Sequence, residues 1–100
     1  MARIFYIDRR PPRFELGQVV ATPGALEAAK NAGDYLTPYL MRHQRGDWGT
    51  LCDEDTQANE DALTCGARLL SAYHLKDGTK VYIITEADRS STCVLLPEEY

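Results

Sequence analysis

The sequence predicts a single α+β domain in which three short helices pack on an antiparallel sheet of three or four strands. Three observations support this fold class: β-favouring runs joined by Asp77-Gly78, two Thr-Pro pairs each followed by a glycine, and 100 residues with 44% apolar content. This length suits one domain with a single hydrophobic core. We assign the domain to residues 14–100 and a basic N-terminal arm to residues 1–13.

The arm combines positive charge with two consecutive prolines. Residues 1–13 hold four arginines against one aspartate, whereas the whole chain has a net charge of -4. The prolines at 11–12 lack backbone donors and disfavour helix before them, so they separate a candidate edge strand at residues 4–7 from the domain. One interpretation is a solvated tail, and the other is nucleic-acid binding. The candidate contacts for the second are Arg9, Arg10 and Arg13.

Proline and glycine signals locate the first strand and the first two helices. Residues 16–21 are typical of a short strand that joins the sheet as its fourth. Thr22-Pro23 and Thr37-Pro38 each supply an N-cap followed by proline at the first helical position, and a glycine stops each helix. These signals predict helices over 23–32 and 38–45.

A third helix is predicted from about Asp53 to Gly66, and it is strongly acidic. Aspartate is a good N-cap, and acidic residues in the first turn suit the positive end of the helix dipole. Residues 46–67 contain no Lys or Arg. Such a tract favours a partner with a basic surface, and the competing interpretation is a solvated, capped helix surface. The candidate partner contacts are Asp47, Asp53, Glu54, Asp55, Glu60 and Asp61.

The C-terminal third is predicted to form an antiparallel meander. Asp77-Gly78 between two apolar runs indicates a two-residue hairpin turn, since both residues tolerate positive φ. That turn pairs Tyr73 with Tyr82 and puts both on one face of the sheet, which makes them candidate partner contacts. The predicted face with the tyrosines also carries Leu69, Ser71 and Ile84, and the opposite face carries Leu70, Ala72, Val81 and Ile83.

Polar residues at turns are the remaining candidates for chemistry. Glu86 and Asp88 lie two apart at a strand end, as a carboxylate pair that shares a proton or a metal would, and Arg89 is adjacent. The competing interpretations are ordinary turn chemistry for these three, and core packing for the turn tryptophan, whose indole N–H needs an acceptor. The full candidate polar site is His43, Asp47, Trp48, Glu86, Asp88 and Arg89.

The motif inventory predicts no cofactor, no metal and no catalytic residue. It contains no Gly-rich phosphate loop, His-Glu-x-x-His pair, paired-cysteine motif or nucleophile elbow, which favours a protein that is not an enzyme. Three cysteines, an odd number without close pairs, are expected to be reduced. The chain has neither a signal-peptide core nor an apolar run of membrane-span length, so we expect a cytoplasmic protein that does not engage a membrane.

Five strings along the chain carry a resemblance to a known group of proteins. They cover residues 14–26, 42–49, 68–73, 83–90 and 95–100, and they include GDWG and ITEADRS followed by LLPEEY. With these strings the chain resembles a family of small bacterial proteins of plasmids and other mobile genetic elements, usually labelled hypothetical or plasmid-related. The resemblance implies a gene neighbourhood, and it brings no catalytic residues.

Three functional hypotheses remain open at this point. The first is a non-enzymatic interaction protein that inhibits a host nucleic-acid-targeting defence complex, of anti-CRISPR or anti-restriction type, through its acidic tract. The second is a small enzyme or ligand-binding domain that uses the candidate polar site. The third is a nucleic-acid-associated regulatory module that uses the basic arm. A homodimer through the tyrosine face is an additional expectation.

Overall fold

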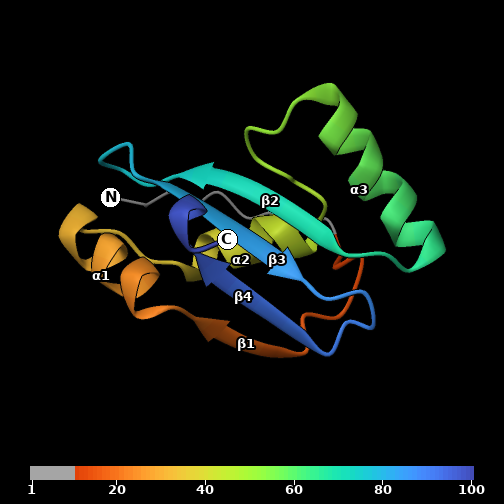
Figure 1. The fold of residues 1–100 in the computed structure, drawn as a ribbon, viewed down its shortest axis with the longest axis horizontal. Coiled ribbons are helices and arrows are strands. Elements are labelled where there is room, and N and C mark those ends of the chain that lie inside the picture. The colour runs from red at the N-terminus through yellow and green to blue at the C-terminus, as the bar shows by residue number, and fades with distance from the viewer. Residues whose placement is uncertain (1–10) are drawn as a thin grey trace, which may run out of the picture.

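The computed structural model describes residues 11–100, which form three helices and a four-stranded sheet, the predicted α+β fold (Figure 1). The predicted edge strand at residues 4–7, with Arg9 and Arg10, lies outside the described residues. The elements are β1 (Gln18–Ala21), α1 (Pro23–Ala32), α2 (Thr37–Gln44), α3 (Asp53–Cys65), β2 (Leu69–His74), β3 (Lys80–Thr85), β4 (Ser91–Leu95) and the 3-10 turn η1 (Pro97–Glu99).

The sheet is mixed, whereas the sequence predicted an antiparallel one. Its strand order is β1-β4-β3-β2. Strands β2, β3 and β4 form the predicted antiparallel meander, but β1 runs parallel to β4, with Gln18 opposite Ser91. Parallel pairing needs a long crossover, and three helices and two strands separate β1 from β4 along the chain.

The β2–β3 hairpin has a three-residue loop, and its register differs from the predicted one by one residue. The Gly78 N–H donates to the Leu75 carbonyl (2.8 Å), and Gly78 has a φ of +89°. A turn that ends on a left-handed glycine is the usual three-residue hairpin loop. The predicted pairing of Tyr73 with Tyr82 is wrong, because the extra loop residue places Tyr73 opposite Val81.

The shifted register also corrects the predicted faces, because a one-residue slip moves every side chain of a strand to the other face. Tyr73 is 1% exposed and lies on the face toward α1 and α2, which we call the back face. Tyr82 lies on the opposite, front face, so the predicted tyrosine face does not exist. The back face carries Leu69, Ser71, Tyr73, Val81, Ile83 and Thr85, and the front face carries Leu70, Ala72, Tyr82 and Ile84.

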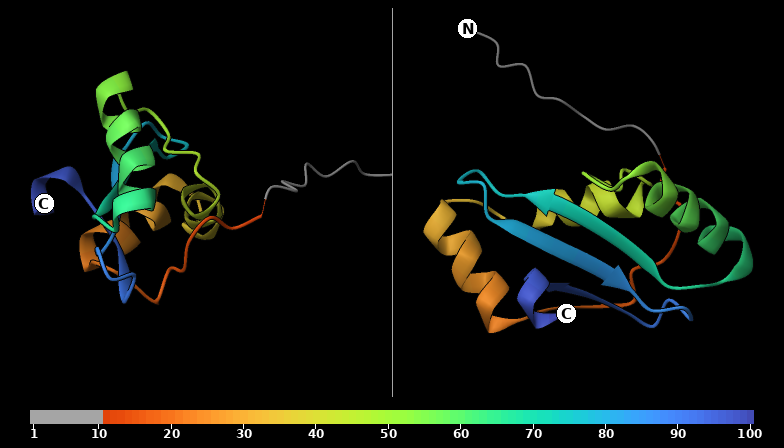
Figure 2. Two further views of the ribbon diagram at one scale, coloured as in Figure 1. Left: turned by 90° about the vertical axis from the view of Figure 1, so that its right-hand side faces the viewer. Right: turned by 45° about the horizontal axis from the view of Figure 1, so that its top comes forward.

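Three helices cover the sheet unevenly. Helix α2 lies behind the sheet and the C-terminal turn η1 lies in front of it, as both views of Figure 2 show. Helix α3 stands beyond the β2 edge (Figure 1). There Trp48, Ala62 and Leu69 form a second buried cluster beside the main core. No helix within residues 11–100 combines the length and apolar character needed to cross a membrane.

Candidate functional site

His43 belongs to a buried chain of hydrogen bonds that crosses the sheet. It lies near the end of α2 and is 0% exposed. Its Nδ1 is 2.5 Å from Ser71 Oγ on β2, and its Nε2 is 2.9 Å from Thr85 Oγ1 on β3. Thr85 Oγ1 is 2.7 Å from Thr92 Oγ1 on β4, which donates to the Leu16 carbonyl just before β1 (2.7 Å). The chain therefore ties one side of the sheet to the other.

Counting donors assigns the His43 tautomer. The single hydroxyl proton of Thr92 goes to a backbone carbonyl, so Thr85 donates to Thr92 and accepts from His43 Nε2–H. Burial lowers the pKa of His43 to about 3, and the charge of Arg89 acts in the same direction. The ring is therefore neutral, and Nδ1 accepts from the Ser71 hydroxyl. This pair looks like a nucleophile with its base, but both residues are 0% exposed and sealed from substrate.

Arg89 connects the β3–β4 turn to the end of α3. It is the one non-glycine residue with positive φ (61°) within residues 11–100. Its guanidinium donates to the carbonyls of Ala62 (3.1 Å), Ala67 (2.6 Å) and Glu86 (3.0 Å). A cation suits this place, where the negative end of the helix dipole collects carbonyl groups. Arg89 therefore binds backbone carbonyls of the turn and of the end of α3.

Glu86 and Asp88 point to different places and do not share a site. Glu86 lines the front face and pairs there with Arg68 (3.4 Å). Asp88 stays in the exposed turn, where hydrogen bonds from the Ser90 hydroxyl and N–H lower its pKa. This is the turn chemistry that the sequence offered as the alternative. The candidate polar site is therefore not assembled, since His43 lies buried on the back face.

Trp48 fills the end of the core, and its indole N–H finds a carboxylate acceptor. It is 4% exposed and donates to Glu60 Oε2 (2.9 Å). The same carboxylate accepts hydrogen bonds from both terminal nitrogens of the Arg13 guanidinium (2.9 and 2.8 Å). Arg13, then Trp48, lowers the pKa of Glu60 by hydrogen bonding. Two candidate binding residues, Arg13 and Glu60, thus bind each other, and the backbone N–H of Arg13 donates to Gln44 (2.8 Å).

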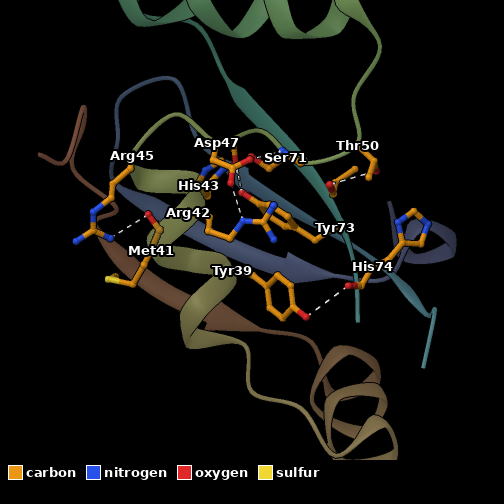
Figure 3. Close-up of polar contacts among 12 residues, drawn as sticks. Tyr39, Met41, Arg42, His43, Arg45, Asp47, Thr50, Ser71, Tyr73 and His74 are labelled. Carbon is orange, nitrogen blue, oxygen red and sulfur yellow. Dashed lines mark hydrogen bonds and ion pairs between the residues drawn. The ribbon is translucent and has the colours of Figure 1, made fainter. Parts of the chain in front are cut away.

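Asp47 and Tyr73 are also held within the fold (Figure 3). The Asp47 carboxylate accepts from Arg42 Nε (2.7 Å), and its backbone carbonyl accepts from the Tyr73 hydroxyl (2.5 Å). Arg42 lies 4.7 Å from the centroid of the Tyr73 ring. Burial raises the pKa of Tyr73. Tyr73 therefore offers no surface to a partner in this arrangement.

The outer surface of α3 keeps its acidic residues exposed. Asp53, Glu54 and Asp55 occupy the first turn, and Asp61 follows two turns later. Asp61 accepts from the Gln57 side chain (3.0 Å). The opposite side of the helix is anchored through buried residues, so the acids stand on a fixed support. Of the six predicted acidic contacts, Asp53, Glu54, Asp55 and Asp61 are the exposed ones.

The front face carries a small hollow of about 220 Å³. Cys93 is one of its lining residues, and burial raises the pKa of the Cys93 thiol, with Glu99 and Glu86 adding to the effect. Cys93 is therefore a poor nucleophile, since the thiolate is the reactive form. The hollow is also smaller than the roughly 300–1,000 Å³ of small-molecule pockets. Its lining residues are Arg68, Ile84, Glu86, Cys93, Leu95, Glu99 and Tyr100.

The β2 edge of the sheet is closed by the chain itself. The Asn59 side chain donates from Nδ2 to the Leu70 carbonyl (2.6 Å) and accepts the Leu70 N–H at Oδ1 (3.1 Å). Two residues further along β2, the Ala72 N–H donates to the Trp48 carbonyl (3.1 Å), and the Ala72 carbonyl accepts from the Thr50 N–H (2.8 Å). Residues 48–50 thus pair with β2 as a further strand would, and Asn59 imitates a backbone amide.

The buried polar residues Asn59, Ser71, Thr85 and Thr92 were missed by the sequence reasoning. Only Asn59 carried a signal, because it precedes Ala62 and Leu63 by three and four residues on the apolar side of α3. The others lie in strands whose inward face was assigned to the wrong register or not assigned. Ser71 and Thr85 bond His43, which is 28 and 42 residues away, and Thr92 bonds the carbonyl of Leu16, 76 residues away, so no local pattern marks this chain of bonds.

Within residues 11–100, no group of three or more His, Cys, Asp or Glu side chains is arranged to hold a metal ion. Cys52 and Cys65 are exposed, Cys93 is partly buried, and all three are free thiols. Comparisons with known protein families, with curated proteins and with solved structures give no significant match to the chain.

Proposed function

We propose that the protein is a non-enzymatic interaction protein that binds a basic protein surface through the acidic outer face of α3. The observation that carries this proposal is the exposure of Asp53, Glu54 and Asp61 on a helix whose other side is anchored to the sheet, with Asp55 also exposed in the first turn. Residues 46–67 contain no Lys or Arg to neutralise them. A single-sign surface of this kind attracts and orients a partner of opposite charge.

The partner that we propose is a nucleic-acid-binding effector of a host defence system, of CRISPR or restriction type. Such effectors expose Lys and Arg side chains to the phosphate backbone, and a row of carboxylates competes for the same side chains. The resemblance to proteins of plasmids and mobile elements supports this setting, because such elements gain from blocking these systems. Binding to an effector of this kind takes place in the cytoplasm.

The test is protection of a target plasmid in bacteria that carry an active CRISPR or restriction system. We expect the chain to raise transformation efficiency, and the combined variant Glu54→Lys, Asp55→Lys, Asp61→Lys to lose that protection by more than about tenfold, since like charges across an interface cost several kcal/mol. The matched control is the combined variant Glu15→Lys, Glu27→Lys, Glu98→Lys, because these three acids are exposed and lie outside α3. Glu60 is left intact because it holds Trp48 and Arg13.

Two results would contradict the proposal. One is a combined variant that melts like the wild type and still protects the plasmid. The other is a wild-type chain that gives no protection although it is expressed and folded. Thermal unfolding of each variant separates lost binding from lost structure.

A further inference from the structure

Among residues 11–100, β4 is the one strand that pairs with β1, so the other edge of β1 has no strand beside it in this part of the chain. Gln18 donates its N–H to the carbonyl of Ser90, just before β4, and Thr22 donates its N–H to the carbonyl of Val94 in β4 (3.0 Å each). Alternate residues of a strand direct their backbone groups to opposite sides, so Val19 and Ala21 direct theirs away from the sheet. Figure 1 shows no other described element beyond β1.

β1 also lacks the features by which edge strands avoid pairing with another chain. The segment Gln18–Ala21 contains no charged residue and no proline. Val19 and Val20 are 44% and 43% exposed, and they lie on opposite faces of the strand. The edge therefore offers unpaired backbone groups between two apolar side chains.

We propose that β1 pairs antiparallel with β1 of a second copy about a two-fold axis at Val20, which joins the two four-stranded sheets. Val19 of each copy then opposes Ala21 of the other, and each such pair exchanges both of its backbone hydrogen bonds. Val20 meets Val20 of the second copy in a non-hydrogen-bonded pair, where side chains lie closest. One pair further out, Pro23 of each copy opposes Gly17 of the other. Pro23 has no backbone N–H that would be left unpaired there, and Gly17 has no side chain that would clash with the proline ring.

A second copy suits this edge because the partner strand must be uncharged and apolar on both faces. The chain has a net charge of -4, so its copies repel one another over most of their surface, but β1 brings no charge to the contact. Helix α3 stands at the opposite edge of the sheet, so the pairing keeps the two acidic helices far apart (Figure 1). A four-residue strand contact is small beside the roughly 1,200–2,000 Å² of stable complexes, so the association is reversible.

Disulfide trapping tests the register of the pairing. In a chain with its three native cysteines changed to serine, Val20→Cys brings two thiols to a pair whose Cα atoms lie about 4.5 Å apart, within the range of a disulfide. Removing Cys93 matters because Val20 is its neighbour on β1. Oxidised glutathione is the oxidant: it takes the two thiol hydrogens and leaves as two molecules of reduced glutathione. We expect a covalent dimer on a non-reducing gel.

The matched control for trapping is Val19→Cys in the same background. In the proposed register position 19 opposes position 21 of the second copy, so the two introduced thiols are out of line, and we expect at least about tenfold less cross-linked dimer. No cross-link at position 20, or equal yields at the two positions, would overturn the proposal.

Sedimentation of the unmodified chain tests the association itself. We expect a monomer–dimer equilibrium at micromolar to millimolar concentration, and Val20→Lys should raise its dissociation constant at least about tenfold because two ammonium groups then face each other at the axis. Leu26→Lys is the control, since Leu26 is a 56% exposed apolar residue of α1 outside the contact. A wild-type chain that stays monomeric to millimolar concentration, or equal weakening by both variants, would refute the pairing.

Discussion

At the β2 edge the Asn59 side chain bonds both backbone groups of Leu70, whereas at the β1 edge no residue of the described range 11–100 bonds the outward backbone groups of Val19 and Ala21. The strands themselves do not explain the difference, since neither contains proline and both are rich in apolar residues. Closure comes instead from α3 and from residues 48–50, which the chain places beside β2 alone. An edge is thus made safe or left open by the segments around it.

The strongest way to break the closed edge is Gly49→Ala. A Cβ at Gly49 would lie 1.8 Å from the Ala72 carbonyl oxygen, and the residue has a φ of +77°. We expect a loss of at least about 3 kcal/mol in the free energy of unfolding, because residues 48–50 must leave β2. The control is Gly66→Ala, where φ is +75° but nothing lies within 4 Å, so only about 1 kcal/mol of backbone strain is expected. Equal losses in urea unfolding would show that steric closure at Ala72 is unimportant.

Replacing the amide that caps β2 should have the next largest effect. Asn59→Leu keeps a similar size but leaves both backbone groups of Leu70 without their partner at a site where Asn59 is 4% exposed. We expect a loss of about 2–3 kcal/mol by urea unfolding, the range for unpaired buried polar groups. Gln57→Leu on the exposed side of α3 is the control and should change stability by less than about 0.5 kcal/mol. If Asn59→Leu leaves the free energy of unfolding unchanged, the Asn59 amide does not contribute to closure of the β2 edge.

Acid should weaken the buried chain that ties β2 to the segment before β1. Between pH 6.5 and about 3 the unfolded chain binds a proton at His43 that the folded chain excludes. The free energy of unfolding therefore falls as the pH drops below 6.5, by up to about 1.4 kcal/mol per pH unit, and His43 contributes no slope above that pH.

Urea unfolding across this pH range, with two variants, checks the assignment. His43→Gln should be less stable and should lose the slope between about pH 6.5 and 5, where carboxylates are still ionised. His74→Gln changes an exposed residue and should keep the slope. If His74→Gln abolishes the pH dependence of the free energy of unfolding and His43→Gln keeps it, the buried His43 ring is not the acid-sensitive group.

The smallest effect is expected at the open edge. Val20→Thr changes a half-exposed side chain without a helix over it, so the dilute monomer should change its free energy of unfolding by less than about 0.5 kcal/mol. Thermal or urea unfolding at low concentration checks this value. A loss comparable to that of Asn59→Leu would mean that β1 is as closed as β2.

Local signals made the helices predictable. The Thr22 hydroxyl accepts the Ala25 N–H (3.0 Å) as the N-cap of α1, and Gly33 ends that helix with a φ of 64°. The prediction from the second Thr-Pro pair was less accurate, because Thr37 is the first residue of α2 and not its N-cap. Leu36 is the N-cap, and it makes no side-chain hydrogen bond. These features depend on residues a few positions apart, which a sequence displays directly.

The hairpin register and the direction of β1 could not be read in the same way. Asp77-Gly78 suits both a two-residue and a three-residue loop, and the choice depends on which face of β3 packs against α1 and α2. The orientation of β1 depends on its pairing with β4, about seventy residues later in the chain. Both are decided by contacts between distant segments.

The candidate site divides along the same line. The exposed acids of α3 were identified because the charge of a tract is a local property. The predicted N-cap was wrong, because Asp53 is the first residue of the helix and Cys52 precedes it as the N-cap, without a side-chain bond. The engagement of Glu60 was missed because its partner Arg13 is 47 residues away. The burial of Tyr73 was missed because the predicted register was wrong: it paired Tyr73 with Tyr82, whereas the structure pairs Tyr73 with Val81 on the buried back face.

Hydrogen exchange of the outward backbone amides tests the contrast between the two edges most directly. In a dilute monomer we predict slow exchange for Leu70 and Ala72, which have partners beyond β2, and fast exchange for Val19 and Ala21, which have none in β4. At high concentration the amides of Val19 and Ala21 should become protected as well. Protection of Val19 and Ala21 in the dilute monomer, or fast exchange at Leu70 and Ala72, would contradict the contrast between an open β1 edge and a closed β2 edge.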